Sequence, residues 1–263
     1  MANRIKIKDT NFEEITEIFR YASNKAALKI LEIYQSENVE AKKKKDDSPV
    51  TKADIESNRI IIETLNKELK FLNVVSEESE CNYNNDIHEF VLVDPLDGTK
   101  EFLNKNGEFT VNIALIQNYN PKLGVIDAPV LETQYFSNGF ESYKVVDNKI
   151  SKIYSSESNK LIIVCSRSHL DQKTQSFMDQ IKMEKEIIKK GSSLKLCMIA
   201  ESQANLYVRY GKTMEWDIAA GHAILKTANA EILELDKEKS IEFIYGKQKF
   251  VNGSFIAFSK SID

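Results

Sequence analysis

Two carboxylates separated by two residues are the part of the sequence best suited to chemistry. Asp94 and Asp97 follow four apolar residues, 90–93, that predict a buried strand. Pro95 fixes the backbone between them and Gly98 permits a sharp turn, so both side chains can point toward one place. An isolated pair of this kind is most often a solvated turn. Its position at the end of a buried strand, where sites on sheets tend to lie, favours a function.

Repulsion between the two carboxylates indicates a bound cation. Neighbouring carboxylates repel at neutral pH, and one pKa rises unless a cation lies between them. Magnesium prefers carboxylate, carbonyl and water oxygens, and it commonly completes its coordination with substrate phosphate oxygens. The pair therefore predicts a magnesium site and a substrate that carries phosphate.

Further acidic residues occur in settings that suit the same site. Glu77 and Glu78 follow a predicted strand that ends at Val75, and Asp217 follows the single tryptophan at a predicted helix start. Each has a plainer interpretation, the glutamates as solvated loop charges and Asp217 as a helix N-cap. From the residues alone, both interpretations stay open.

Three segments that contain these residues resemble a known family. Residues 76–78 (Ser-Glu-Glu), 94–99 (Asp-Pro-Leu-Asp-Gly-Thr) and 216–221 (Trp-Asp-Ile-Ala-Ala-Gly) occur in the order and approximate spacing of the inositol monophosphatase-like, lithium-sensitive phosphatases. Several linked motifs make a chance match improbable. The resemblance runs from about Ser48 to about Ala230, and the N-terminal helix and the C-terminal segment add little to it.

A closer resemblance is to the CysQ-type branch of these enzymes, the 3′(2′),5′-bisphosphate nucleotidases. It rests on the continuous stretch 94–116 and on the segments 166–169 (Ser-Arg-Ser-His) and 191–195 (Gly-Ser-Ser-Leu-Lys). This resemblance implies hydrolysis of the 3′-phosphate of adenosine 3′,5′-bisphosphate (PAP) to AMP, and of its sulfated relative PAPS to APS, in sulfur metabolism.

The family resemblance also implies a metal site and a water activator. Two or three magnesium ions are expected, with Asp94 as a bridging ligand, and lithium and calcium are expected to inhibit. Thr99, paired with Asp54, would orient the attacking water and help to deprotonate it, with Glu77 also in a catalytic role. Asp54 could instead cap the following helix, and both roles can coexist. The implied metal ligands are Glu77, Asp94, the main-chain carbonyl of Leu96, Asp97 and Asp217.

Substrate contacts are implied mainly for the second half of the chain. The main-chain N–H groups of Gly98 and Thr99, at a predicted helix start, suit phosphate oxygens. Lys195 or Arg209 would suit the 5′-phosphate that is not cleaved. Taken alone, a histidine after a strand is as often a packing residue, and Arg209 can be a strand-end charge. The further residues implied to contact the nucleotide are His169, Ser192 and Asp217.

Two rival functions follow from the same residues. An inositol monophosphatase or a fructose-1,6-bisphosphatase of the same fold would share every metal ligand, and the segment 191–195 with His169 and Arg209 argues against it. A non-catalytic sensor that binds a nucleotide or a metal is the rival of another class. Thr99 and Asp54 argue against the sensor, because a binding protein needs no water activator.

Composition limits the partners and the compartment. The net charge of −4 from 36 basic and 40 acidic residues provides no basic field for a nucleic acid polymer, so a small nucleotide is the expected partner. Three widely spaced cysteines argue against a disulfide framework and favour the cytoplasm. Neither an export signal nor a membrane span is expected. A peripheral membrane contact, a monomeric or homodimeric state, and the role of the lysines 42–45 stay open.

The elements that must position these residues follow from the hydrophobic pattern. Helical spacing predicts a helix over Phe12–Tyr34 and another after Thr51 or Asp54, whereas 40–47 is expected to be an exposed loop. Strands are expected near 71–75, 90–93, 110–116, 122–126, 134–137, 141–146, 161–164, 187–188 and 204–208, and further helices over 172–183, 194–201 and 218–227.

These elements indicate an α/β (α+β) fold, and the family resemblance implies a layered αβαβα sandwich of the inositol monophosphatase and fructose-1,6-bisphosphatase type. An α+β half over residues 1–150 would carry most metal ligands, and an α/β half over 151–263 would carry Asp217 and the specificity residues. The polar stretch 146–160 marks the boundary between them. Cys165 and Cys197 are expected to be buried packing residues, and His88 and His222 to be structural.

Overall fold

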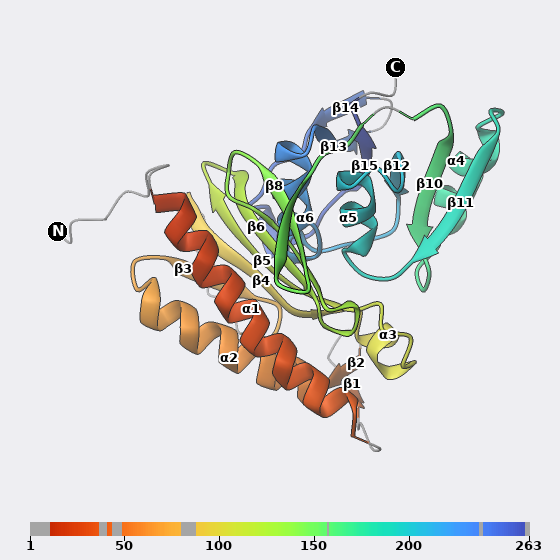
Figure 1. Cartoon of the computed structure of the whole chain (residues 1–263). Coiled ribbons are helices and arrows are strands. Elements are labelled where there is room, and N and C mark those ends of the chain that lie inside the picture. Colours follow the sequence, from red (N-terminus) through yellow and green to blue (C-terminus); the bar gives the residue numbers. More distant parts are fainter. Residues whose placement is uncertain are drawn as a thin grey trace.

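Layers of helices and sheets alternate through the molecule (Figure 1). The computed structural model describes residues 11–36, 41–43, 49–79, 88–156, 158–236 and 239–260. A helix pair covers one sheet, two further helices lie between that sheet and a second one, and a last helix lies outside the second sheet. The predicted αβαβα layering is confirmed.

The outer helix pair packs through the apolar stripe that the sequence predicted. Helix α1 (Phe12–Tyr34) begins and ends where the periodicity does, and it buries Phe12, Ile15, Phe19 and Ile30 against α2 (Lys52–Glu68) and the first sheet. Each large apolar side chain that is fully buried stabilises the fold by about 1.5–3 kcal/mol. The pair is therefore a firm support for the sheet behind it.

The first sheet has seven strands among the described residues, and they follow in chain order. β3 and β4 pair in parallel and the later neighbours pair antiparallel, so most of this sheet is a meander joined by short turns. The expected hairpin is present as β5 and β6. The strands are β3 (Asn73–Ser76), β4 (Glu89–Asp97), β5 (Thr110–Gln117), β6 (Asn120–Ala128), β7 (Thr133–Ser137), β8 (Ser142–Val146) and β9 (Lys149–Ile153).

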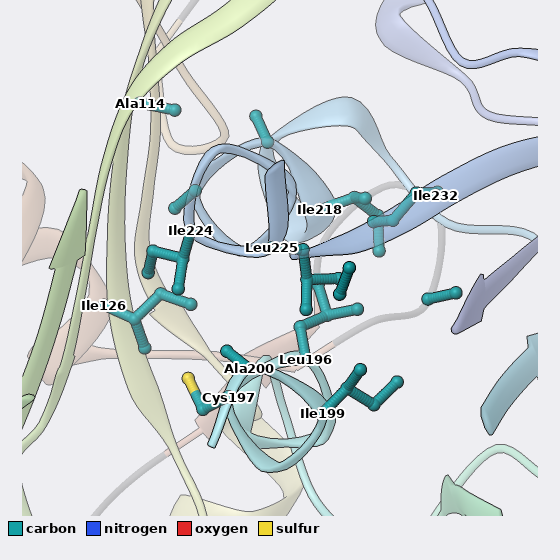
Figure 2. Close-up of a cluster of buried hydrophobic side chains, with 14 of the residues drawn as sticks. Ala114, Ile126, Leu196, Cys197, Ile199, Ala200, Ile218, Ile224, Leu225 and Ile232 are labelled. Carbon is teal, nitrogen blue, oxygen red and sulfur yellow. The ribbon is translucent and has the colours of Figure 1, made fainter. Parts of the chain in front are cut away.

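Two helices fill the space between the sheets. Figure 2 shows α5 (Leu194–Ala200) and α6 (Glu215–Thr227) packing on each other, with Ala114 and Ile126 of the first sheet on one side and Ile232 of the second nearby. Helix α6 lies very close to β6, because a Cβ on Gly124 would come within 2.3 Å of the Ala220 carbonyl oxygen. This contact fixes the start of α6 relative to the first sheet.

The second sheet has six strands in the described part of the chain, in the order β11-β10-β12-β15-β13-β14. Its first three strands run parallel to one another, so their carboxyl ends lie at one edge. Helix α4 (Gln172–Gln180) connects β10 to β11. The strands are β10 (Leu161–Ser166), β11 (Lys185–Lys190), β12 (Leu206–Arg209), β13 (Ala230–Asp236), β14 (Lys239–Glu242) and β15 (Ser254–Ser259).

Several sequence expectations need correction. β4 continues through Asp97 rather than ending at Val93, because pairing with β5 resumes after an irregularity between Asp94 and Asp97. The stretch 146–160 contains β9, which pairs with β8 and so belongs to the first sheet. The division into halves at residue 150 stays a prediction.

The lysine-rich segment also differs from its expectation. Lys42 and Lys43 lie in a short exposed strand, β1 (Ala41–Lys43), which pairs with β2 (Pro49–Thr51), instead of in a loop. An exposed position is compatible with strand pairing because the main chain alone makes the ladder. Residues 44–48 lie outside the described residues, and so does Cys81.

The predicted packing residues are confirmed where they are described. Cys165 and Cys197 are both buried and free. His222 is buried and its ring Nδ1 lies 3.0 Å from the Tyr245 hydroxyl, and burial lowers its pKa to about 3. His88 makes an edge-to-face contact with Tyr119. No helix in the described ranges is long and apolar enough to cross a membrane.

Candidate active site

A cavity of about 440 Å³ opens where the ends of β4, β10, β11 and β12 meet the start of α6. The structure brings all but one of the predicted site residues to its wall. Asp54 lies behind the wall, in contact with Thr99. The predicted residues that line the cavity are Glu77, Asp94, Leu96, Asp97, Gly98, Thr99, His169, Ser192, Lys195, Arg209 and Asp217.

The irregular end of β4 aims the first two carboxylates. Asp94 pairs with Asn112 and Asp97 with Thr110, so β4 contains one extra residue between the two pairs. Such a bulge bends the strand and redirects side chains. The Asp94 carboxylate accepts the Leu96 N–H at 3.1 Å, and Ser57 of α2 donates to the Pro95 carbonyl at 2.6 Å. The outer helix layer thus holds the turn in place.

Gly98 allows the chain to leave the strand and begin α3 (Thr99–Leu103). Its φ of +93° lies in the left-handed region, where glycine is favoured. A Cβ there would also lie 3.3 Å from the Ser192 Cβ of the second-sheet side. The predicted helix start after Gly98 is confirmed. The Gly98 position therefore lets the two sides of the cavity approach each other.

Asp217 joins this group from the start of α6. It stands at the third helical position and its carboxylate accepts the Met214 N–H at 2.8 Å, so the simple N-cap interpretation is wrong. Burial raises the pKa of Asp217 well above its usual range, and the charges of Asp97 and Glu77 raise it further. These acidic side chains thus act on one another inside the cavity.

Asp97 has an opposing cation. Burial raises its pKa, while the Lys195 ammonium and the Ser193 hydroxyl lower it. Burial in turn lowers the pKa of Lys195, and Asp97 is the leading charge that raises it. Lys195 also donates to the Ser192 carbonyl. Lys195 therefore interacts both with the acidic group, through the charge of Asp97, and with the loop that carries Ser192.

Ser193 connects two of the carboxylate positions and was missed as a site residue. Its hydroxyl lies 2.9 Å from Asp97 Oδ2 and 2.8 Å from the Asp217 carbonyl oxygen, and the Asn112 amide donates to it at 2.9 Å. Both Ser193 and Asn112 are buried. Both stand in the segments that carry the family resemblance, but a serine or an asparagine there carries no signal of its own. They connect the Asp97 carboxylate of the first-sheet side to the Asp217 main chain at the start of α6.

The donor set fits magnesium. No three Asp, Glu, His or Cys side chains within the described ranges form a metal-binding group by themselves. Magnesium needs few protein ligands, because it keeps several waters and takes oxygens from a substrate phosphate. The acidic side of the wall offers hard oxygen donors, and a cation there would relieve the mutual repulsion of Asp97 and Asp217. The residues that would hold it are Glu77, Asp94, Leu96, Asp97 and Asp217.

Thr99 and Asp54 form the predicted pair. The Thr99 hydroxyl lies 3.0 Å from Asp54 Oδ1, while Asp54 Oδ2 accepts the Thr51 N–H at 2.7 Å and the Thr51 hydroxyl at 2.6 Å. Thr51 is the N-cap of α2 and Asp54 is its capping-box partner, so the helix-capping role and the contact with Thr99 coexist. Burial raises the pKa of Asp54, which makes this carboxylate a better proton acceptor.

The opposite wall of the cavity is basic. His169 Nε2 lies 2.9 Å from Nζ of Lys100, a pocket residue that the sequence prediction missed, and Arg209 donates to the His169 carbonyl. Burial lowers the pKa of His169, and the charges of Lys100 and Arg209 lower it further. The imidazole is therefore neutral at pH 7 and can accept or donate a hydrogen bond. This wall suits an anionic group.

Comparison with known proteins places the chain in a family. The family model described as "Inositol monophosphatase family" matches residues 11–261. A "3'(2'),5'-bisphosphate nucleotidase CysQ" of Salmonella typhimurium is 38% identical over 92% of this chain and 97% of the relative, and one from Haemophilus influenzae is 30% identical over 78% of this chain and 79% of the relative.

Solved structures agree with this placement. The crystal structure of CysQ from Bacteroides thetaiotaomicron, "a bacterial member of the inositol monophosphatase family", is 36% identical, covers 94% of this chain and 97% of its own, and superposes with a TM-score of 0.83. An inositol monophosphatase from Anabaena shares the fold at a TM-score of 0.77 with 22% identity. The chain belongs to the inositol monophosphatase family.

Proposed function

We propose that the chain is a magnesium-dependent phosphomonoesterase that hydrolyses the 3′-phosphate of adenosine 3′,5′-bisphosphate to AMP and phosphate, with the sulfated nucleotide as a second substrate. The observation that carries the proposal is the arrangement of one cavity. Carboxylates and Thr99 line one wall, and basic side chains that suit a second anionic group line the other. The substrate named for the 38% identical relatives has two phosphates, as this arrangement requires.

The acidic wall would hold two or three magnesium ions through Glu77, Asp94, the Leu96 carbonyl, Asp97 and Asp217. When bound, magnesium supplies activation of a water molecule and stabilisation of negative charge on phosphate and leaving oxygens. Lys195 and Ser193 hold Asp97 in place for this role.

Thr99 and Asp54 would move the proton of the attacking water. The Thr99 hydroxyl donates its hydrogen to Asp54. The lone pairs of the Thr99 oxygen are therefore free to accept a hydrogen bond from a water in the cavity. The raised pKa of Asp54 favours transfer of a proton through Thr99 onto its carboxylate. Glu77 would share in orienting the same water. The main-chain N–H groups of Gly98 and Thr99 would hold oxygens of the phosphate that is cleaved.

The basic wall would bind the rest of the nucleotide. Lys195 and Arg209 are basic side chains suited to the 5′-phosphate, and His169 and Ser192 offer hydrogen-bonding groups beside them. Asp217 lies in the same cavity as the metal-binding carboxylates and the basic side chains, and it would contact the substrate as well. An inositol phosphate or a fructose bisphosphate has no nucleoside to occupy this wall, so it is the less favoured substrate.

A pure sensor is disfavoured by the intact Thr99–Asp54 pair. The free buried cysteines suit a cytoplasmic enzyme, acting as a monomer or a homodimer on a small nucleotide rather than on a nucleic acid polymer. A contact with a membrane surface is compatible with this proposal.

Phosphate release from adenosine 3′,5′-bisphosphate tests the proposal. Purified protein should release phosphate with magnesium, lose activity in EDTA and recover it when magnesium is restored. Tens of millimolar lithium, and calcium in place of magnesium, should inhibit. Absence of magnesium-dependent hydrolysis of this nucleotide by folded protein would exclude the proposed function.

A further inference from the structure

Glu108 lies outside the residues assigned above, yet its carboxylate contacts both loops of the basic wall. It stands between α3 and β5, where its N–H donates to the Asn106 side chain at 2.9 Å, and the side chain is 12% exposed. Glu108 therefore belongs to the first-sheet side of the molecule. The partners of its carboxylate, Arg167, Lys190 and Gly191, belong to the second-sheet side.

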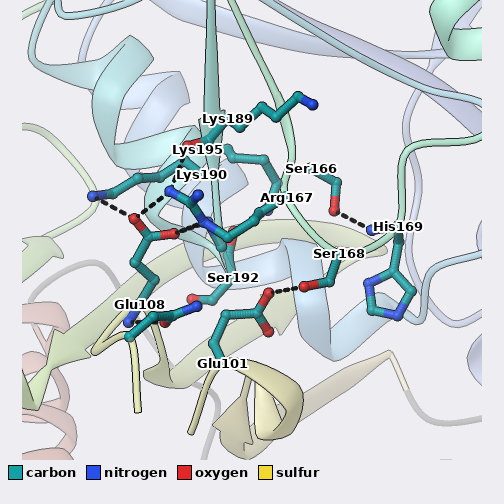
Figure 3. Close-up of polar contacts among 12 residues, drawn as sticks. Glu101, Glu108, Ser166, Arg167, Ser168, His169, Lys189, Lys190, Ser192 and Lys195 are labelled. Atoms are coloured by element: carbon teal, nitrogen blue, oxygen red, sulfur yellow. Dashed lines mark hydrogen bonds and ion pairs between the residues drawn. The ribbon is translucent and has the colours of Figure 1, made fainter. Parts of the chain in front are cut away.

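Arg167, just beyond β10, makes a two-point contact with this carboxylate. Its Nε donates to Glu108 Oε2 at 2.7 Å and its Nη2 to Oε1 at 2.9 Å (Figure 3). Arg167 also reaches the end of β11, because Nη2 donates to the Lys189 carbonyl at 3.0 Å and the main-chain N–H to the Lys190 carbonyl at 3.2 Å. Two-point guanidinium contacts fix direction as well as distance.

The loop after β11 is held by the same carboxylate. The Gly191 N–H donates to Glu108 Oε2 at 2.8 Å, and Lys190 Nζ lies 3.2 Å from Oε1. A Cβ on Gly191 would come within 2.7 Å of the Glu108 carbonyl oxygen, so the two segments are in close contact. One carboxylate thus joins three groups from two loops.

The loops in question carry residues of the basic wall. Ser166 ends β10 and His169 lies on the loop that follows it, while Ser192 and Ser193 lie on the loop after β11 and Lys195 lies in the first turn of α5. Ser192 has a φ of +50°, which is rare for a residue other than glycine, so its position depends on outside support. That support includes the hydroxyl of Thr110, 2.8 Å away, and the Glu108 contact with Gly191.

Glu108 is charged when it makes these contacts. Burial alone would raise its pKa, but hydrogen bonds from Arg167, the Gly191 N–H and Lys190 outweigh burial and lower it.

A second carboxylate, Glu101, accepts the Ser168 hydroxyl at 2.5 Å and supports the loop after β10 at another point.

We propose that Glu108 is a positioning residue for substrate recognition: it fixes the loops 166–169 and 190–193 against the first-sheet side and so sets the spacing between the basic wall and the metal-binding carboxylates. Glu108 does not line the cavity in this structure. This inference rests on the proposed function, and it predicts that loss of Glu108 weakens nucleotide binding more than it slows the chemical step.

Glu108→Gln tests this directly. Glutamine keeps the size and one acceptor oxygen but loses the charge and the two-point contact. For adenosine 3′,5′-bisphosphate, KM should rise about tenfold while kcat changes less than about threefold, because a lost charge-assisted contact acts on the substrate loops and not on Thr99 or Asp54. Steady-state kinetics with saturating magnesium gives both constants.

Glu201→Gln is the matched control. Glu201 is 11% exposed and also joins the two sides, accepting Tyr135 Oη at 2.9 Å and Lys144 Nζ at 2.7 Å, but it does not line the cavity and touches neither substrate loop. Its variant should lose a similar amount of thermal stability with an unchanged KM. If the two variants show the same KM, the positioning role is wrong.

Arg167→Gln provides a second variant in case Glu108→Gln does not fold. The Arg167 side chain is 42% exposed, so its loss should be tolerated, and KM should rise in the same direction. If kcat falls while KM stays at the wild-type value in either variant, the role of the residue is merely structural and the inference is overturned. Wild-type protein without phosphatase activity would instead refute the proposed function.

Discussion

The two walls of the cavity are built in different ways. The acidic wall draws Asp94, Leu96, Asp97 and Thr99 from one continuous segment at the end of β4. The basic wall collects His169, Ser192 and Arg209 from the carboxyl ends of three parallel strands, β10, β11 and β12. Most of the first wall is local in sequence, although Glu77 and Asp217 join it from other segments, whereas the second exists only once the second sheet has formed.

This difference separates chemistry from recognition. The continuous segment carries the groups that every phosphatase of this fold would need, and its geometry depends on one bulge and one glycine. The basic wall depends on contacts between distant loops, such as those of Glu108 with Arg167 and Gly191. Substitutions on the two walls should therefore change different kinetic constants.

The largest effect is expected from Asp97→Asn on the acidic wall. Removing this charge should lower kcat by about three orders of magnitude, because the site would lose one of the proposed magnesium ligands and the transition-state stabilisation that it would support. Steady-state hydrolysis of adenosine 3′,5′-bisphosphate measures it. Asp127→Asn is a fitting control, because Asp127 is also buried but lies outside the cavity. Equal kcat values for the two variants would contradict the assignment.

Thr99→Ala should have the next largest effect. Without the hydroxyl that contacts Asp54, kcat should fall by about 10²–10³-fold, the usual contribution of a positioned proton acceptor. Thr99→Ser keeps the hydroxyl and should restore most of the activity. A serine variant as slow as the alanine variant would remove Thr99 from the proposed proton path.

On the basic wall, His169→Ala should raise KM about tenfold with little change in kcat, as expected for a lost hydrogen bond to bound substrate. Burial lowers the pKa of His169, so its ring stays neutral as pH falls from 8 to its usual titration range. KM of the wild type should thus show no His169-dependent change between pH 6.5 and 8. A change there that the alanine variant abolishes would show a charged ring.

Prediction from sequence succeeded to different degrees on the two walls, because most of the acidic wall is one continuous segment and the basic wall is assembled from distant segments. Asp94, Asp97, Gly98 and Thr99 lie in one segment, so a strand followed by a turn was enough to place them together, whereas Glu77 and Asp217 were assigned through the family resemblance. Ser193, Asn112 and Lys100 were not assigned roles, because they act through partners far away in the chain. The helices and strands were predicted from hydrophobic periodicity, which is a local property, whereas their layering was implied by the family resemblance.

Where sequence prediction went wrong, tertiary pairing overrode a local signal. No strand was predicted within the polar stretch 146–160, yet β8 provides a partner that makes residues 149–153 a strand. Lys42 and Lys43 likewise form a strand because β2 pairs with them. Polar composition alone does not reveal such a partner.

The smallest effect concerns a buried carboxylate away from both walls. Burial raises the pKa of Asp127 to about 6, above its usual range, despite hydrogen bonds from Gln134 and Ser23. The folded state therefore binds the proton more tightly than the unfolded state, and this group's stabilising contribution is complete below pH 4 and lost as pH rises to 6.

Asp127→Asn removes the ionisable group and with it the loss of stability that Asp127 causes as pH rises from about 4 to about 6. The variant should be more stable than the wild type at pH 7 by about 2 kcal/mol, and the gain should vanish near pH 4. Urea unfolding at the two pH values measures the difference. A gain that is equal at both pH values would show that the charge is not its cause.

The central claim is that the basic wall makes this member of the family a nucleotide phosphatase. The most direct test compares kcat/KM for adenosine 3′,5′-bisphosphate and inositol 1-phosphate with the same enzyme and saturating magnesium. The nucleotide should be preferred by at least about tenfold, because only it can place groups on both walls. A kcat/KM for inositol 1-phosphate equal to or above that for the nucleotide would contradict the claim.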